Sequence, residues 1–332
     1  MSKKTNNLVL LYIIAGLLIL FGIVKWYQKN RAEHTLKSEL VKLDTARVNE
    51  IDIFPLSENR EEIKFYKEGN EWKIKKGNII AEPDPSVVKN LLTTLNDMKV
   101  KNLVATDRKK WKDYNVTDTS ATRVKVIENK RVKLNLLIGR FSYQQNQSPY
   151  AMYGGGGVTG TTYVRKENEN EVYGVDGFLV FTFNQQFNNF RKQTIGKFET
   201  NAIERIKFNY PADSSFVVEL KNKKWEIGQE IVDSAKVVSY LNQMSYKNSS
   251  NFNDNFSLKG MPQYQVTFEG KDIKPIIIDA YSIAPDSFII NSNLNPKSFF
   301  ASNVSGLFKE IFVSRKLFLP DNNTKKEKKL KK

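Results

Sequence analysis

The pattern of apolar positions begins with an unbroken run over residues 8–24, flanked by basic residues on both sides. At 1.5 Å of rise per residue, this run makes about 25 Å of helix, close to the hydrocarbon thickness of a bilayer. Trp26 and Tyr27 follow the run and suit the headgroup level of a membrane. The run does not end in the small-x-small site of a cleaved signal peptide. The sequence therefore predicts a transmembrane anchor over residues 8–27.

Beyond residue 45 the apolar positions alternate every second residue, as in strands, and the same pattern occurs twice. Val48–Phe54 resembles Ile203–Asn209. A hairpin follows each of these strands, with Trp72 and Trp225 at equivalent places. We expect both tryptophans to be core anchors rather than ligand-stacking residues, because a large ring on a hairpin buries much apolar area.

A helical period of three to four residues follows in each half. Asp84 is the expected N-cap of the first helix, with Pro85 as its first residue, and Asp233 is the expected N-cap of the second. One apolar stripe on each helix should cover a face of a sheet. The stripes are Val87, Val88, Leu91, Leu92, Leu95 and Met98 in the first helix, and Val237, Val238, Leu241 and Met244 in the second.

Further strands and similar endings complete both halves. The expected correspondences are Thr122–Glu128 and Val132–Ile138 with Gln263–Glu269 and Ile273–Asp279, Val175–Leu179 with Val304–Phe308, and Phe190–Ile195 with Ser314–Leu319. The predicted class is α+β, with an N-terminal transmembrane helix followed by two tandem repeated, mostly antiparallel α+β domains. The expected divisions are a cytoplasmic leader over 1–7, the anchor over 8–27, a juxtamembrane linker over 28–44, a first repeat over 45–197, a second repeat over 198–320, and a disordered basic tail over 321–332.

The net charge of +16 raises the question of nucleic-acid binding. Much of the excess lies near the anchor and in the lysine-rich block over residues 325–332. A like-charge block of this kind suits contact with acidic lipid or with an acidic partner. No nucleic-acid-binding motif accompanies the charge, so we expect no nucleic-acid partner.

The chain has few of the residues that usually carry chemistry. It contains no cysteine and one histidine, which excludes thiolate nucleophiles and Cys-ligated metals. His34 lies in a charged stretch beside the anchor, where a solvated role is expected. No Ser/His/Asp arrangement or metal-ligand spacing occurs in the sequence. We therefore expect no catalytic residue, no cofactor and no metal site.

One conspicuous segment, residues 142–162, is predicted to be a loop that the second half lacks. Its glycines, Gly154–Gly157, are not followed by the Lys-Ser/Thr pair of a phosphate-binding loop. A long loop rich in Tyr, Gln and Gly is either a mobile insertion or a recognition surface. The candidate partner contacts are Tyr143, Tyr150, Met152 and Tyr153.

These motifs together resemble the family of domain of unknown function 4340. The likeness covers most of residues 40–320, and its most specific part is the Asp107–Tyr114 box with the Leu137-Ile138-Gly139 strand. Members of this family look like accessory proteins of ABC-type export systems, including those associated with gliding motility. The resemblance implies a single-pass anchor in the cytoplasmic (inner) membrane with the repeated body outside it. It supplies no catalytic residues, and the charges around the anchor do not decide the orientation.

The sequence thus leaves three functions open, of which we expect the first. The first is a non-enzymatic, membrane-anchored extracytoplasmic accessory or scaffold subunit, whose partner is an ABC-type transporter membrane subunit or another envelope protein. The second is a cell-envelope polysaccharide- or lipid-binding module that uses the aromatic residues of the 142–164 segment. The third is a carboxylate-only hydrolase, which requires two Asp or Glu side chains that face each other.

Overall fold

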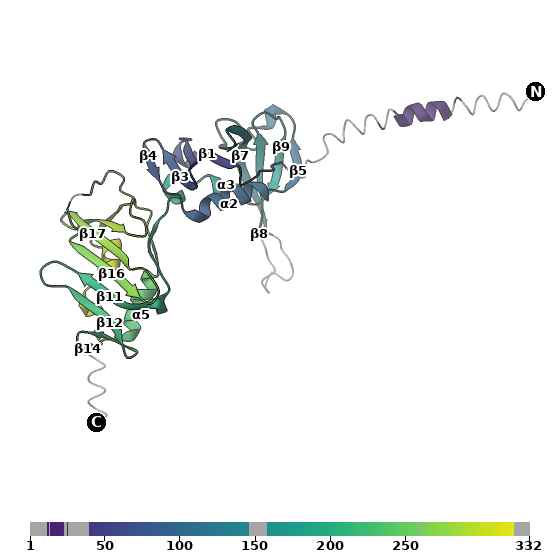
Figure 1. Cartoon of the computed structure of the whole chain (residues 1–332). Coiled ribbons are helices and arrows are strands. Elements are labelled where there is room, and N and C mark those ends of the chain that lie inside the picture. Colours follow the sequence, from purple (N-terminus) through teal and green to yellow (C-terminus); the bar gives the residue numbers. More distant parts are fainter. Residues whose placement is uncertain are drawn as a thin grey trace, which may run out of the picture. The chain divides into compact units, whose positions relative to one another are not determined.

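The computed structural model describes residues 12, 14–22, 25, 40–145, 158–258 and 260–321 (Figure 1). They group into two compact units. The first comprises Met1–Leu56 and Asn90–Asn184, and the second comprises Ser57–Lys89 and Gln185–Lys332. Both units combine antiparallel strands with short helices, so the expected α+β class with mostly antiparallel sheets is confirmed.

In the first unit, six strands are antiparallel neighbours in the order β1-β6-β7-β8-β9-β5. Figure 1 shows β8 extending away from the rest of this unit. The core lies under the central strands, where Ile51, Val124 and Leu136 are fully buried. The elements are β1 (Val48–Phe54), β5 (Val100–Ala105), η2 (Arg108–Lys110), β6 (Thr122–Glu128), β7 (Arg131–Gln145), β8 (Val158–Lys166), β9 (Val172–Asp176) and α3 (Leu179–Phe183), with α2 (Pro85–Asn96) running into the unit.

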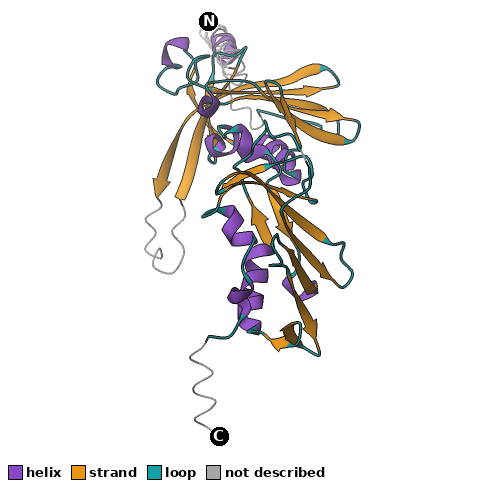
Figure 2. Ribbon diagram, turned by 90° about the vertical axis from the view of Figure 1, so that its left-hand side faces the viewer, coloured by secondary structure: helices purple, strands orange, loops and turns teal. Residues whose placement is uncertain are grey.

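The second unit contains the meander β2-β3-β4 and a sheet in the order β14-β13-β12-β11-β16-β17-β18-β19. Figure 2 shows its helices gathered along one face of that sheet, over a core that includes Phe208, Phe268 and Leu241. The elements are η1 (Leu56–Glu58), β2 (Ile63–Glu68), β3 (Glu71–Lys76), β4 (Ile79–Ala81), α4 (Phe187–Phe190), β10 (Thr194–Lys197), η4 (Thr200–Ala202), β11 (Ile203–Asn209), β12 (Phe216–Lys221), β13 (Lys224–Ile227), β14 (Glu230–Ile231), α5 (Ser234–Met244), β15 (Tyr246–Asn248), β16 (Tyr264–Gly270), β17 (Ile276–Ala284), β18 (Ser287–Ser292), β19 (Phe300–Asn303), α6 (Leu307–Ile311) and η5 (Arg315–Phe318).

The same antiparallel pairs recur in the same chain order along the two halves of the sequence. Strand β1 pairs with β6 as β11 pairs with β16, and β6-β7-β8-β9 are neighbours just as β16-β17-β18-β19 are. The meander β2-β3-β4 likewise corresponds to β12-β13-β14. This recurrence accords with the repeated pattern in the sequence. The compact units themselves are divided elsewhere, because residues 57–89 group with the second unit.

Both predicted helices begin where their capping residues indicate. The Asp84 carboxylate accepts a hydrogen bond from the Ser86 amide (2.9 Å) at the start of α2. The Asp233 carboxylate accepts bonds from the amides of Ala235 and Lys236 at the start of α5. Each side chain thereby satisfies backbone donors that the helix leaves unpaired.

One position of the second apolar stripe was predicted wrongly. Val238 is 41% exposed, whereas Tyr240 is buried and donates a hydrogen bond from its hydroxyl to the Ile311 carbonyl (2.7 Å). The buried face of α5 is formed by Val237, Tyr240, Leu241 and Met244. These positions follow the i, i+3, i+4, i+7 spacing of one helix face, and Val238 falls outside it.

The two tryptophans have different surroundings. Trp225 is buried, as expected of a core anchor, and lies opposite Leu220 in the β12–β13 hairpin. Trp72 is only partly buried, and the Lys67 ammonium lies 5.3 Å from its ring centroid. Trp72 is therefore a partly exposed ring beneath a lysine ammonium group and not the buried core anchor that was expected.

The expected match of Phe190–Ile195 with Ser314–Leu319 was wrong by several residues, as two backbone hydrogen bonds show. The Asp84 amide donates to the Phe190 carbonyl (2.9 Å), and the Asp233 amide donates to the Phe318 carbonyl (2.8 Å). Because the two aspartates are equivalent helix caps, Phe190 corresponds to Phe318. Arg191 therefore aligns with Leu319, not with Arg315.

The segment 142–162 is not a loop throughout. Strand β7 continues to Gln145 and β8 begins at Val158, and their arms pair in register with Tyr143 opposite Gly160. The two arms carry Phe141, Tyr143, Val158 and several threonines, residue types that are enriched in strands, which explains why the hairpin extends into the predicted loop. Residues 146–157 lie outside the described part of the chain.

Residues 14–22 are helical. Within the described residues, no helix combines the length and the apolar character needed to cross a membrane. The anchor expected over residues 8–27 includes residues outside the described part, and it stays a prediction. The expected leader over 1–7 and residues 322–332 of the expected tail also lie outside that part.

Candidate partner-binding surface

The base of the β7–β8 hairpin is fixed to the start of α3 by hydrogen bonds. Thr162 is fully buried, and its hydroxyl donates to the Gly177 carbonyl (2.7 Å) and accepts from the Leu179 amide (3.1 Å). The Gly177 amide in turn donates to the Gly160 carbonyl (3.1 Å). Gly177 has a φ of 94°, a backbone conformation that residues other than glycine rarely adopt. These contacts set the position of α3 relative to the hairpin.

Lys101, on the edge strand β5, adds a second set of contacts to the hairpin base. Its ammonium group donates to the Gly160 carbonyl and to the Thr161 hydroxyl, each at 3.1 Å. The same group forms an ion pair with Asp176 at 2.7 Å. One cation thus joins three strands, β5, β8 and β9, at the point where the hairpin leaves the sheet. We expect this base to be held in one arrangement.

Four aromatic side chains lie on this base and form what we call the aromatic patch: Phe141, Tyr143, Phe178 and Phe181. Phe141 packs against Phe178 and Phe181 with ring centroids 5.6 and 5.1 Å apart. Phe141, Tyr143 and Phe181 are 36%, 68% and 58% exposed. Tyr143 follows Phe141 by two residues on the strand and so lies on the same face. Several large rings together at the surface are typical of an interaction site.

A glycine makes room for one ring of the patch. A Cβ atom at Gly160 would come within 2.6–2.7 Å of three carbon atoms of Phe178. Gly160 lies opposite Tyr143 in the hairpin, so the Phe178 ring covers the strand beside that tyrosine. The absence of a side chain at this position is therefore a requirement of the patch.

The other side of the sheet is supported by a buried arginine. Arg165 is 1% exposed, its Nε donates to the Val116 carbonyl (3.1 Å), and its guanidinium lies 3.6 Å from the centroid of the Trp111 ring. Burial lowers the pKa of Arg165, and the carboxylates of Asp118 and Glu167 partly offset this effect. The Asp107–Tyr114 box supplies Trp111, and Asp107 caps η2 by accepting from the Lys109 amide. The contacts of the box are those of a structural support.

The predicted contact residues fall into two groups. Tyr143 lies on the aromatic patch and is exposed. Tyr150, Met152 and Tyr153 lie outside the described residues. The sequence patterns did not indicate Phe141, Phe178 or Phe181, since exposed phenylalanines follow no period and the first lies in an ordinary strand.

The chemistry available at the aromatic patch is that of apolar and ring contacts. The charged groups beside it, Lys101 and Asp176, are paired with each other. Among the residues that the structure describes, no group of three or more His, Cys, Asp or Glu side chains is placed to hold a metal ion. We find no cofactor-binding arrangement to assign to this patch.

The class that this fold and surface define is a mixed α+β protein with a projecting hairpin and an exposed aromatic patch. The family model described as "Domain of unknown function (DUF4340)" matches residues 81–261, which is more than half of the chain. The chain therefore belongs to this family. The matched range contains the whole of the aromatic patch and its base. No curated protein and no solved structure matches the chain.

Proposed function

We propose that this protein is a non-enzymatic accessory or scaffold subunit, anchored in the cytoplasmic membrane, whose extracytoplasmic body binds a partner protein through the aromatic patch. The observation that carries the proposal is the exposure of Phe141, Tyr143 and Phe181 on a hairpin base held by Lys101 and Thr162. The family resemblance favours an ABC-type export or gliding-related complex as the assembly, with its membrane subunit as the partner.

The energetics of the aromatic patch favour a protein partner. A few residues carry most of the binding free energy in protein interfaces, and aromatic rings are prominent among them, often at about 2 kcal/mol or more for each central ring. A surface held in its bound arrangement also loses less entropy on binding than a flexible loop does. The hydrogen bonds of Thr162 and Gly177 provide such a rigid base. The aromatic patch therefore has the properties of a preformed anchor site.

Exposed apolar side chains in the N-terminal helix support the membrane anchor. Leu17, Leu18, Ile19, Leu20 and Phe21 are each 60–65% exposed. Successive helix residues are about 100° apart, so these five side chains surround the helix. A helix that is apolar on all sides requires an apolar environment, and a lipid bilayer provides one.

The proposal is tested by capture of the partner from native membranes. The full-length protein is purified in mild detergent beside the variant Y143S/F181S, which removes the two most exposed rings. We expect the wild type to recover a transporter membrane subunit and the variant to recover at least tenfold less, from the loss of about 2 kcal/mol or more per ring. The control I283S changes a similarly exposed residue of β17 (52% exposed) and should recover the wild-type amount. The proposal is contradicted if the wild type is recovered without any partner protein, or if all three proteins recover the same amount of partner.

A polysaccharide-binding role is the second candidate, because exposed rings also stack on sugars. The Phe178 and Phe181 rings are inclined to Phe141 by 75° and 57°, so the three rings do not form one flat platform. This geometry favours side chains of a protein over the face of a sugar ring. Binding of the wild type, but not of Y143S/F181S, to a glycan array would select the second candidate instead.

A further inference from the structure

The chain enters the first unit through a short docked segment. Leu40, Val41 and Leu43 are 4–8% exposed. The Leu43 amide donates to the side-chain oxygen of Asn96 (2.9 Å), and its carbonyl accepts from the Asn96 side-chain nitrogen (3.1 Å). This reciprocal pair fixes the path of the backbone at the end of α2. The docked segment is the first described part of the chain after the predicted anchor, so the surface around it is the part of the unit that the chain connects to that anchor.

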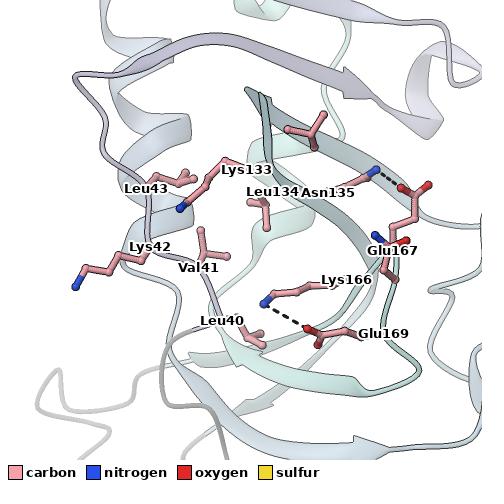
Figure 3. Close-up of a pocket in the computed structure, with 12 residues that line it drawn as sticks. Leu40, Val41, Lys42, Leu43, Lys133, Leu134, Asn135, Lys166, Glu167 and Glu169 are labelled. Atoms are coloured by element: carbon pink, nitrogen blue, oxygen red, sulfur yellow. Dashed lines mark hydrogen bonds and ion pairs between the residues drawn. The ribbon is translucent and has the colours of Figure 1, made fainter. Parts of the chain in front are cut away.

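The docked segment borders a cavity of about 470 Å³ whose other walls are the start of β7 and the end of β8 (Figure 3). Figure 3 shows Lys42 pointing away from the cavity, while Lys166 points toward Glu169, with which it pairs at 3.6 Å. Glu167 is also engaged, since it pairs with Arg123 at 3.0 Å. The acidic side chains of this cavity are thus occupied by partners within the unit.

The basic side chains beside the cavity are arranged differently. We define the basic pole as Lys42, Lys130, Arg131, Val132 and Lys133. All five are exposed, and Val132 retains 61% of its accessible surface. None of the four cations forms an ion pair within the described part of the chain. An exposed apolar side chain among unpaired cations is the composition of a surface that binds anionic headgroups.

We infer that the basic pole binds the anionic lipid headgroups of the membrane in which the chain is anchored. This inference rests on the anchor in the proposed function. Residues 28–39 join the anchor to Leu40, and even when fully extended they span at most about 43 Å. So short a connection holds the pole at a high effective concentration next to the membrane, where weak attractions suffice. Each cation near an anionic surface strengthens binding about fivefold, so the pole as a whole adds several hundredfold.

The absence of cysteine allows each position to be labelled singly. A fluorophore on Val132→Cys in the full-length protein reports on the pole, and one on Leu18→Cys reports on the anchor. The protein is placed in nanodiscs that carry a lipid-attached quencher. The bilayer is phosphatidylcholine, either alone or mixed with phosphatidylglycerol. We expect the Leu18 label to be quenched in both lipids and the Val132 label to be quenched strongly only with phosphatidylglycerol. About 1 M salt, at which the Debye length is about 3 Å, should remove the difference.

Charge-reversal variants test whether membrane binding depends on the cations of the basic pole or only on the total charge of the protein. The variant K130E/R131E/K133E should lose the quenching at residue 132 in phosphatidylglycerol. The matched control K223E/K224E/K271E changes the charge equally at two exposed turns of the second unit, and Asn222-Lys223 has the same left-handed turn backbone as Asn129-Lys130. The control should keep the quenching.

The outcomes distinguish the inference from the function on which it rests. An unquenched Leu18 label overturns the anchor itself. A quenched Leu18 label with a Val132 label that is unquenched, or equally quenched in both lipids, overturns the basic pole alone. An equal loss in the two charge-reversal variants also overturns the pole, because only total charge then matters.

Discussion

The ring of Phe178 lies over Gly160, so close that a Cβ at position 160 would approach three ring carbons to 2.6–2.7 Å. The two residues come from different elements, β8 and the turn before α3. Their contact links the projecting hairpin to the helix that carries Phe181. The arrangement of the aromatic patch therefore depends on a position that has no side chain.

The substitution Gly160→Ala tests this dependence. The added methyl group should displace the Phe178 ring, because the carbon atoms cannot overlap, and should lower stability by about 1–3 kcal/mol. Capture of the partner should fall severalfold, while the circular dichroism spectrum stays that of a folded protein. The control Ser142→Ala lies on the opposite face of the hairpin and should capture normally. An unchanged capture by Gly160→Ala would show that the patch does not depend on the position of Phe178.

Replacement of the buried arginine by lysine should destabilise the first unit. The Arg165 guanidinium donates to the carbonyls of Val116 (3.1 Å) and Glu167 (2.9 Å), and an ammonium group cannot reproduce this forked geometry. We expect Arg165→Lys to cost about 2–4 kcal/mol, measured as a lower midpoint of thermal unfolding. The same change at Arg315, which is half exposed and pairs with Glu230, should cost no more than about 1 kcal/mol. Equal effects at the two sites would refute the structural role of Arg165.

Glu58 should contribute stability that depends on pH. Burial alone would raise the pKa of Glu58, but hydrogen bonds from Lys76 and from the Phe187 amide, with the charge of Lys76, bring it below its ordinary value of 4.5. A lowered pKa means that the contribution is present above the ordinary value and is lost as the pH falls through the folded value. Glu58→Gln should therefore cost about 1–3 kcal/mol in urea unfolding at pH 7 and progressively less in acid. A cost that does not change with pH would contradict this account.

Asp279 should behave in the opposite sense. Burial raises its pKa above the ordinary value of 3.8, and a hydrogen bond from Gln265 (2.9 Å) only partly offsets the effect. A group with a raised pKa contributes its full stability below the ordinary value and loses it as the pH rises through the folded value. Asp279→Asn keeps the hydrogen-bond acceptor and removes the charge, so it should stabilise the protein by about 0.5–2 kcal/mol at pH 7. The gain should shrink toward pH 4, and destabilisation at pH 7 would be the contrary result.

Local sequence patterns predicted much of the fold because they carry their own physical signals. The caps Asp84 and Asp233 satisfy the first amides of α2 and α5, and the alternating positions of β6 and β16 place one face of each strand in a core. Val238 shows the limit of this approach. It is apolar and adjacent to the stripe, but only the packed face of the helix decides which side chain is buried.

The aromatic patch shows why the candidate site was only partly predicted. Tyr143 was found by the composition of its segment. Phe178 and Phe181 gain their positions from Thr162 and Gly177, through hydrogen bonds between segments that are distant along the chain. No periodicity in the sequence records such contacts, so the sequence patterns did not indicate these two rings.

The most direct test of the proposed partner surface is photo-crosslinking in living cells. A benzoylphenylalanine residue replaces Tyr143 or Phe181 in the full-length protein, and Ile283 serves as the control position. We predict that the first two positions crosslink to one membrane subunit of a transporter and that position 283 does not. Failure of Tyr143 and Phe181 to crosslink, or an identical product from all three positions, would contradict the account.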